Sequence, residues 1–217
     1  MGMVSTRTYG QFCGFARAVE IVGERWAMLL VRDLLVGPKR FGELQRGLPK
    51  IPTNILTARL KELEAAGIVR RRASTQPGGG VLYELTPSGE ELEPAVLALG
   101  RWGAKNVLDA PRPDEIVTND SMIMALRTTF QPKNAKGVHA SYELRMGPVV
   151  IHARIGNGKI ETGAGPLPDA DLIIEAGPAL KSVMTGEISP REAIANKSVR
   201  VIGDPALFDR FAELFKI

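Results

Sequence analysis

Cysteine is nearly absent from this chain of 217 residues, since Cys13 is the only one. A single thiol excludes a disulfide within the chain and a zinc site built from clustered cysteines. The only histidines, His139 and His152, have no cysteine or Glu-x-x-His pattern near them, and the sequence lacks a Gly-x-Ser-x-Gly elbow. We therefore expect no metal, no cofactor, no catalytic residues and no enzymatic activity.

Long hydrophobic runs are absent as well. The apolar run Trp26 to Val31, near the N-terminus, is far shorter than the roughly 20 residues that cross a bilayer. Polar residues interrupt the region around Arg7 and Arg17, unlike the apolar stretch of a secretory signal. We expect a cytoplasmic protein with no membrane partner, and its 44% hydrophobic and 24% charged residues are typical of a folded chain.

A strong net charge is also missing, because 28 Lys and Arg residues against 24 Asp and Glu residues leave only +4. The distribution is uneven, however. Residues 1–75 hold 13 basic and 6 acidic side chains, a local excess of +7, whereas residues 111–217 hold 13 of each. Such a concentrated positive charge is typical of a module that binds a polyanion.

The length of the chain and its composition predict two domains. Pro111 and Pro113 stand among charged residues between two apolar segments, which is typical of a linker. We place the N-terminal domain at 1–108, the linker at 109–117 and the C-terminal domain at 118–217.

The N-terminal half has the spacing of a helix-turn-helix. Apolar residues recur at helical spacing from Cys13 to Val36 with a break at Gly23, which predicts two helices. A short helix over 41–48, a tight turn and a longer helix that begins at Thr53, the expected N-cap, complete the outline. The longer helix buries one stripe, which consists of Leu56, Leu60 and Leu63.

The opposite face of that longer helix carries small or hydrogen-bonding side chains: Asn54, Thr57, Ala58 and Lys61. Such a surface fits a major groove about 12 Å wide, where Asn can pair with adenine, Thr can meet a thymine methyl, and Lys can reach guanine or phosphate. An ordinary solvated helix face has the same pattern, so this helix alone leaves both interpretations open.

A basic hairpin is predicted directly after this helix. Two strands, over 68–72 and 81–85, are joined by the glycine-containing segment 76–80, and the first strand contains Arg70, Arg71 and Arg72. A hairpin in this place is typical of a wing whose arginines lie along DNA phosphates, although arginines also protect sheet edges against aggregation. The helix-turn-helix, the hairpin and the charge excess coincide, which favours DNA binding.

Several segments carry a family resemblance: Gly23-Glu24-Arg25-Trp26, Gly37 to Leu44, Leu56 to Glu64 and Leu82 to Pro87. Through these and Cys13, residues 13–106 resemble the HxlR-type winged-helix transcriptional regulators, relatives of the MarR group. The resemblance implies a homodimer on a pseudo-palindromic double-stranded DNA operator. Pro52 stands where many members have Ser, which moves the expected cap to Thr53. The expected DNA-binding residues are Lys39, Arg40, Thr53, Asn54, Thr57, Arg59, Lys61, Arg70, Arg71 and Arg72.

One long helix is predicted from Thr86-Pro87 to about Val107, because Thr suits the N-cap position and Pro suits the first helical position. Its residues Leu99 and Trp102, with Phe12 and Phe15 near the N-terminus, are more than a small winged helix can readily bury. The resemblance implies that these four form the dimer interface, and an intramolecular core is the alternative.

Cys13 has two interpretations. A free cysteine often serves as a small buried apolar residue. Some members of the resembled family use a cysteine at the matching position as a sensor of oxidants or electrophiles, and Arg17, one turn further on, would then favour the thiolate.

The C-terminal half is predicted to be α+β with an antiparallel sheet. Asn157-Gly158, between two apolar strands, is a strong hairpin signal, and Ser189 begins a capping box. The expected elements are a helix over 120–130, strands over 142–146, 149–155, 159–162 and 172–175, helices around 180–184 and after 189, a strand over 199–202 and a terminal helix after 205.

The order of these elements, with Met184 to Pro190 and Val201 to Asp204, resembles the sterol-carrier-protein-like domains over 118–217. Asn196-Lys197 stands where that family usually has Gly. The resemblance implies an apolar tunnel between sheet and helices that holds a lipid or another hydrophobic small molecule. The expected lining, each member of which also suits plain core, is Phe130, Ile151, Leu180, Val183, Met184, Phe208 and Phe211.

The sequence therefore predicts a dimeric, sequence-specific DNA-binding transcriptional regulator, a repressor with a hydrophobic small molecule as its expected effector. One alternative is a carrier of lipids or hydrophobic metabolites whose basic half contacts a protein or a membrane. The other is a redox-sensing regulator that uses Cys13.

Overall fold

The computed structural model describes residues 8–75, 79–109 and 112–217, and the chain divides into two compact units, Met1–Val96 and Leu97–Ile217. The first unit begins with α1 (Gly14–Val22) and α2 (Ala27–Val36), which meet near Gly23 as predicted. Glycine is required at this position, because a Cβ there would lie 2.5 Å from the carbonyl oxygen of Val19.

The predicted helix-turn-helix is confirmed by α3 (Phe41–Gly47) and α4 (Thr53–Ala65), with the stripe Leu56, Leu60 and Leu63 at most 2% exposed. The predicted cap of α4 is wrong. Pro52 occupies the N-cap position, whereas Thr53 is already helical and its hydroxyl accepts a hydrogen bond from Nε2 of Gln45 at 2.8 Å. The hydroxyl of Thr53 thus links α4 to α3 across the turn.

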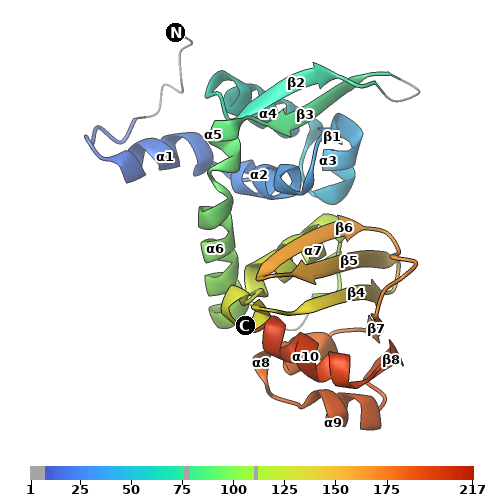
Figure 1. The fold of residues 1–217 in the computed structure, drawn as a ribbon. Helices are drawn as coiled ribbons and strands as arrows, with labels where there is room; N and C mark the ends of the chain where they lie inside the picture. The colour runs from blue at the N-terminus through green and yellow to red at the C-terminus, as the bar shows by residue number, and fades with distance from the viewer. Residues whose placement is uncertain (1–7, 76–78, 110–111) are drawn as a thin grey trace. The chain divides into compact units, whose positions relative to one another are not determined.

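The predicted hairpin is also confirmed, by β2 (Val69–Ala73) and β3 (Val81–Leu85). A short strand, β1 (Lys39–Arg40), was not expected; it adds to the other side of β3, which gives the order β1-β3-β2. The hairpin extends beyond the helices of its unit (Figure 1). The part of the predicted glycine-rich tip at 76–78 lies outside the described residues.

The single long helix predicted from residue 86 to 107 is wrong, because α5 (Pro87–Glu90) and α6 (Glu93–Asn106) are separate. Thr86 is the N-cap of α5, as expected, and its hydroxyl accepts a hydrogen bond from the backbone N–H of Gly89 at 3.1 Å. Pro94 explains the interruption, since its nitrogen carries no hydrogen and its ring would clash with the carbonyl of Glu90 in a continuous helix.

The division between the two compact units falls inside α6, after Val96. In the second unit, Nη1 of Arg101 donates a hydrogen bond to the carbonyl of Thr128 at 3.2 Å, so this end of α6 is fixed to the following helix. Ala110 and Pro111, within the predicted linker, lie outside the described residues.

The helices and strands of the second unit correspond to the predicted ones, with boundaries that differ by a few residues and one additional 3₁₀ helix, η1. At Asn157 and Gly158 the backbone takes φ angles of 51° and 80°, as a tight hairpin requires. The elements are α7 (Asn119–Thr129), η1 (Pro132–Ala135), β4 (His139–Met146), β5 (Val149–Gly156), β6 (Lys159–Ala164), β7 (Leu172–Ala176), α8 (Ala179–Thr185), α9 (Pro190–Ala195), β8 (Val199–Gly203) and α10 (Ala206–Leu214).

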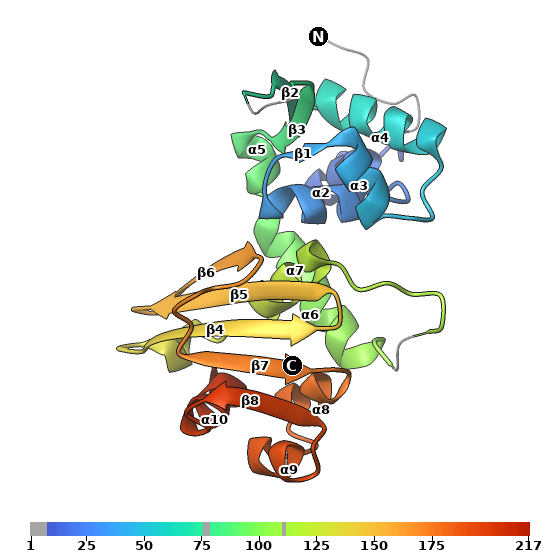
Figure 2. The same ribbon diagram turned by 90° about the vertical axis from the view of Figure 1, so that its right-hand side faces the viewer.

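The sheet of this unit is mixed, which corrects the predicted antiparallel sheet. Its order is β6-β5-β4-β7-β8, and β7 runs parallel to β4 while the other neighbours are antiparallel. The reason is the β6–β7 connection, which crosses one face of the sheet (Figure 2). On this path the backbone N–H of Leu167 donates a hydrogen bond to the buried carboxylate of Glu143 on β4 at 2.6 Å.

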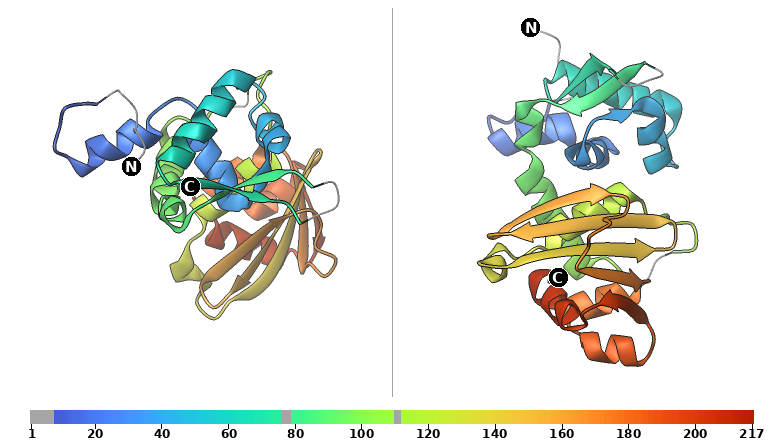
Figure 3. Two further views of the ribbon diagram at one scale, coloured as in Figure 1. Left: turned by 90° about the horizontal axis from the view of Figure 1, so that it is seen from above. Right: turned by 45° about the vertical axis from the view of Figure 1, so that its right-hand side comes forward.

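Helix α7 packs on β5 and β6 (Figure 3). Nε of Arg127 on this helix donates a hydrogen bond to the hydroxyl of Thr162 on β6 at 2.9 Å. Helix α10 packs on β7 and contributes Phe211, which is fully buried against Tyr142 of β4. The predicted α+β class is therefore confirmed, with a helix-turn-helix in the first unit. Within the described ranges, no helix is long and apolar enough to cross a membrane.

Candidate nucleic-acid interface

The outer face of α4 carries the side chains expected to meet bases. Asn54, Thr57 and Lys61 are exposed, whereas Ala58 is half-buried. The hydroxyl of Thr57 donates a hydrogen bond to the carbonyl of Thr53 at 2.9 Å, so this polar group is satisfied within the helix. The structure thus brings one amide, one methyl-bearing hydroxyl and one ammonium together on a single exposed face.

Arg59 differs from the expectation that it binds DNA. Its side chain is only 16% exposed, with Nη2 3.2 Å from Oε2 of Glu24 and Nη1 on the carboxylate of Glu62. Arg59 follows Leu56 by three positions and precedes Leu63 by four, so it lies on the buried side of α4. The spacing could have been read from the sequence. The ion pair with Glu24 links α4 to the connection between α1 and α2.

Lys39 and Arg40 form β1 and are half-buried there. Lys39 is paired with Tyr83, and Arg40 with Leu82, in the register with β3. The backbone N–H of Arg40 also donates a hydrogen bond to the Glu43 carboxylate at 2.5 Å, at the start of α3. Lys39 and Arg40 therefore add two positive side chains to the sheet, on a third strand beside the hairpin.

The three arginines of β2 are exposed but are divided between the two faces of the hairpin. Arg71 points to α4, where its Nε lies 2.8 Å from Oε1 of Glu64. Arg70 and Arg72 share the other face, where they lie 2.9 Å and 2.6 Å from the two carboxylate oxygens of Glu84 on β3. Their side chains remain 62%, 56% and 43% exposed for Arg70, Arg71 and Arg72.

These ion pairs perturb the groups that form them. Hydrogen bonds from Arg72 first, and then from Arg70, hold the pKa of Glu84 below its usual value, and the hydrogen bond to Glu64 raises the pKa of Arg71. The arginines of these pairs lie at the surface, where ion pairs contribute little to stability, so they can exchange their carboxylates for phosphates. Sequence reasoning missed both acidic partners, although Arg70 and Glu84 stand opposite each other in the hairpin register.

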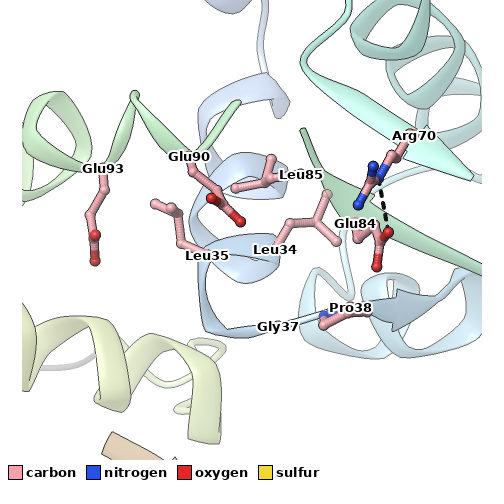
Figure 4. Close-up of a pocket in the computed structure, with 9 residues that line it drawn as sticks. All are labelled: Leu34, Leu35, Gly37, Pro38, Arg70, Glu84, Leu85, Glu90 and Glu93. Atoms are coloured by element: carbon pink, nitrogen blue, oxygen red, sulfur yellow. Dashed lines mark hydrogen bonds and ion pairs between the residues drawn. The ribbon is translucent and has the colours of Figure 1, made fainter. Parts of the chain in front are cut away.

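A pocket of about 290 Å³ lies at the base of the hairpin within the first unit (Figure 4). Leucines from α2 and β3 form one part of its wall, and Arg70 reaches Glu84 at another part. The lining residues are Leu34, Leu35, Gly37, Pro38, Arg70, Glu84, Leu85, Glu90 and Glu93. No residue expected to bind a small molecule is among them.

The side chains expected at a dimer interface are exposed in the single chain. Phe12 and Phe15 are 106% and 79% exposed, and Leu99 and Trp102 are 56% and 59% exposed. None of these four side chains belongs to the core of its own unit. Cys13 is exposed as well, which contradicts its interpretation as a buried residue, and Nη1 of Arg17 lies 3.1 Å from Oε2 of Glu20.

The side chains expected to line a tunnel in the second unit are buried. They are at most 8% exposed, and Phe130, Phe208 and Phe211 join Tyr142 and Phe215 in an aromatic cluster. The rings of Phe211 and Phe215 lie 4.5 Å apart, and those of Tyr142 and Phe211 lie 5.3 Å apart. Ile151, Leu180, Val183 and Met184 complete the expected set within the core.

Tyr142 brings a polar atom into this aromatic cluster. Its hydroxyl is buried and has no hydrogen-bond partner within the described part of the chain. Burial raises the pKa of Tyr142 to about 12. In the same described part, no group of three or more His, Cys, Asp or Glu side chains is arranged to hold a metal ion.

The N-terminal half of the chain matches known proteins in sequence. The family model described as HxlR-like helix-turn-helix matches residues 21–110. The HTH-type transcriptional regulator YybR of Bacillus subtilis is 38% identical over 107 residues, which are 48% of this chain and 86% of YybR. The chain belongs to the HxlR-like helix-turn-helix family. It is thus a DNA-binding transcriptional regulator of the helix-turn-helix type.

Other relatives of this HxlR-like chain cover a similar share of it. The HTH-type transcriptional regulator YkvN of Bacillus subtilis is 41% identical over 91 residues, which are 42% of this chain and 77% of YkvN. The redox regulator HypR, solved in its oxidized form, is 39% identical, covers 45% of this chain and 100% of its own, and has a TM-score of 0.42. The family model does not extend over residues 111–217, so the sterol-carrier resemblance stays a prediction.

Proposed function

We propose that this HxlR-like regulator is a dimeric repressor that reads its operator with α4 and holds the DNA backbone with the sheet β1-β3-β2. The observation that carries the proposal is the exposed face of α4 beside three arginines of β2 that stay 43% to 62% exposed. The proposed division of labour gives specificity to the helix and affinity to the sheet.

Base contacts are assigned to the first half of α4. Asn54 has the amide that pairs with the N6 and N7 groups of adenine, and Lys61 has an ammonium for guanine or phosphate. The hydroxyl of Thr57 is engaged by the Thr53 carbonyl, which favours a contact of the Thr57 methyl with thymine. Thr53, at the start of the helix, is exposed next to these residues.

Phosphate contacts are assigned to Lys39, Arg40, Arg70, Arg71 and Arg72. All five stand on the two strands that flank β3. Each cation that meets a phosphate releases counterions, so affinity should fall steeply with salt. Arg59 is left out of the proposed contacts because its guanidinium is held by Glu24 and Glu62.

Dimerisation is proposed from the exposed apolar side chains. Phe12 just before α1, Phe15 within α1, and Leu99 and Trp102 on α6 are all exposed, and exposed apolar side chains of this size often mark a contact with another protein. A two-fold dimer would present two α4 helices to half-sites about one helical turn apart. We propose 1–108 as the DNA-binding and dimerisation domain and 118–217 as the effector domain, joined by 109–117.

One gel-shift series tests this proposal. The full chain is titrated onto the DNA upstream of its own gene and onto a random duplex of equal length, at three stated salt concentrations. We expect tighter binding to the upstream DNA and a steep salt dependence for both duplexes. A reporter placed behind the upstream DNA should be transcribed less when the protein is added. Equal and weak binding to both duplexes would refute it and would favour the carrier alternative.

The second unit is proposed to hold a hydrophobic small molecule as effector, in the manner of the sterol-carrier-like domains that it resembles. The buried Tyr142 hydroxyl supports this proposal, because a bound acceptor atom would satisfy a donor that is otherwise unpaired in the described residues. The tight aromatic cluster means that such a ligand must displace side chains to enter. Native mass spectrometry of the purified protein tests the proposal, and a mass equal to the bare chain after exposure to a lipid extract would refute it.

Redox control is favoured by one observation, the exposure of Cys13 next to the exposed Phe12. A thiol in this place would change the proposed dimer contact if it were oxidised. Cys13→Ser should abolish release from the operator by a mild oxidant such as diamide and leave binding under reducing conditions unchanged. Release of the serine variant by the same oxidant would refute the role.

A further inference from the structure

The face of the hairpin that holds Arg70 and Arg72 also holds one carboxylate, Glu84. In the register of the sheet, Arg40 and Arg72 both stand opposite Leu82, and Arg70 stands opposite Glu84. Because side chains alternate between the faces of a strand, Arg40, Arg70 and Arg72 share a face with Glu84. The opposite face, which bears Val69 and Leu85, packs into the core.

Glu84 sits deeper than the cations that it binds. Its side chain is 13% exposed, whereas those of Arg70 and Arg72 are 62% and 43% exposed. Each of its oxygens accepts one hydrogen bond, from Nε of Arg70 at 2.9 Å and from Nε of Arg72 at 2.6 Å. Figure 4 shows Arg70 reaching down to Glu84 at the wall of the pocket.

Arg70 and Arg72 therefore each give one hydrogen bond from Nε to the same carboxylate, and a DNA phosphate is an anionic acceptor for the same guanidinium groups. A phosphate that approaches the exposed side of these arginines competes with Glu84. The carboxylate also removes one unit of positive charge from a face that would otherwise carry three. Both effects weaken contacts with any duplex, whatever its sequence.

We propose that Glu84 is an internal competitor of the DNA backbone, which sets the sequence-independent affinity of the hairpin and its salt dependence. This inference rests on the proposed phosphate contacts of Arg70 and Arg72. It adds a residue that lowers the binding of the hairpin to DNA, among residues that were all assigned to raise it. The competition keeps recognition dependent on the bases that α4 reads.

The test compares Glu84→Gln with Glu91→Gln in the full-length chain. Both variants remove one negative charge from the first unit, but Glu91 is an exposed residue at the end of α5, away from the hairpin register. Binding of a random duplex is measured by fluorescence anisotropy at several salt concentrations. Glu84→Gln should tighten binding by roughly three- to tenfold and steepen the salt slope by about 0.9, the value for one added phosphate contact.

Glu91→Gln should change neither quantity by more than a small part of that effect. In a chain that already carries Arg70→Ala and Arg72→Ala, Glu84→Gln should act no more strongly than Glu91→Gln, since the competition has been removed. Misfolding cannot imitate the expected result, because an unfolded variant does not bind DNA more tightly.

Weaker binding by Glu84→Gln, or an unchanged salt slope, would overturn the inference, since Glu84 would then position the arginines for DNA or have no part in binding. The proposed function fails in a different way. If Arg70→Ala, Arg71→Ala and Arg72→Ala together leave the salt slope of the wild type unchanged, the hairpin does not contact phosphate at all. A flattened slope in that variant with no effect of Glu84→Gln overturns the inference alone.

Discussion

The two units of this regulator treat their charged side chains differently. In residues 1–75 there are 13 basic and 6 acidic side chains, and the arginines of β2 stay largely exposed above their partners. In residues 111–217 the numbers are 13 and 13, and Glu143, Arg145, Glu175 and Arg200 form a continuous ladder of ion pairs across β4, β7 and β8. In the second unit the opposite charges pair with each other across the strands of the sheet. In the first unit the excess of exposed positive side chains remains available to bind a polyanion.

The two units also differ in how they bury large apolar side chains. The second unit buries Phe208, Phe211 and Phe215 completely, whereas the N-terminal segment leaves Phe12 and Phe15 in contact with solvent. An exposed phenyl group contributes nothing to the stability of its own chain and suits a contact with another copy. Residues that stabilise the fold are thus distinct from residues available to partners, and substitutions can change either group separately.

The largest effect is expected in the aromatic cluster. Phe211→Ala removes a ring that lies 4.5 Å from Phe215 and 5.3 Å from Tyr142, and should lower the free energy of unfolding by about 3 to 5 kcal/mol. Urea denaturation followed by circular dichroism measures this loss. Phe15→Ala is the matched control, since its exposed ring should affect the dissociation constant of the dimer but not the unfolding of the second unit.

The next largest effect is expected for the exposed arginines of β2. Replacing Arg70, Arg71 and Arg72 together by Ala should weaken binding to any duplex by on the order of 100-fold near 0.1 M salt and flatten the salt slope by roughly 3. Fluorescence anisotropy at four salt concentrations gives both values. The matched control, Arg145→Ala in the ladder of the second unit, should leave the salt slope as it is in the wild type.

A smaller loss is expected from the recognition helix. Asn54→Ala removes one bidentate base contact, so operator affinity should fall by roughly 1 to 3 kcal/mol, mainly at one base pair of each half-site. Random DNA serves as the internal control and should be bound as before. An equal loss on both duplexes would move Asn54 from base contact to backbone contact.

The smallest effect is expected at the buried hydroxyl of the second unit. Without a ligand, Tyr142→Phe should stabilise the fold by about 1 kcal/mol, because it removes a buried donor that has no partner in the described residues. The raised pKa of about 12 also means that the folded state resists deprotonation of Tyr142, so wild-type stability falls as pH rises from about 10 to 12. The variant should lack this part of the fall, which denaturation at both pH values measures.

Local patterns in the sequence predicted most of the first unit, because each element there is defined by neighbouring residues. The spacing of Leu56, Leu60 and Leu63 located α4 and its exposed face, and two strand segments joined by the glycine-containing segment 76–80 located the hairpin. The interruption at Pro94 was missed, although the ring of proline makes it a local effect. The ion pairs with Glu64 and Glu84 depend on residues 7 to 14 positions away, which a local pattern does not relate.

The second unit shows the limit of such patterns more clearly. Its strands were located by their apolar residues, but the parallel pairing of β4 with β7 depends on a connection that crosses the sheet, and no single strand encodes that path. The aromatic cluster likewise joins Phe130, Tyr142 and Phe211 from separate elements. Long-range packing decides both features.

The most direct test of the proposed division of labour is the ratio of the dissociation constants for random and operator duplexes, measured at one salt concentration. We expect Asn54→Ala to lower this ratio by about tenfold. The triple alanine variant of Arg70, Arg71 and Arg72 should keep it within about twofold of the wild type while weakening both complexes. A ratio that falls in the triple variant and stays unchanged in Asn54→Ala would contradict the proposed division of labour.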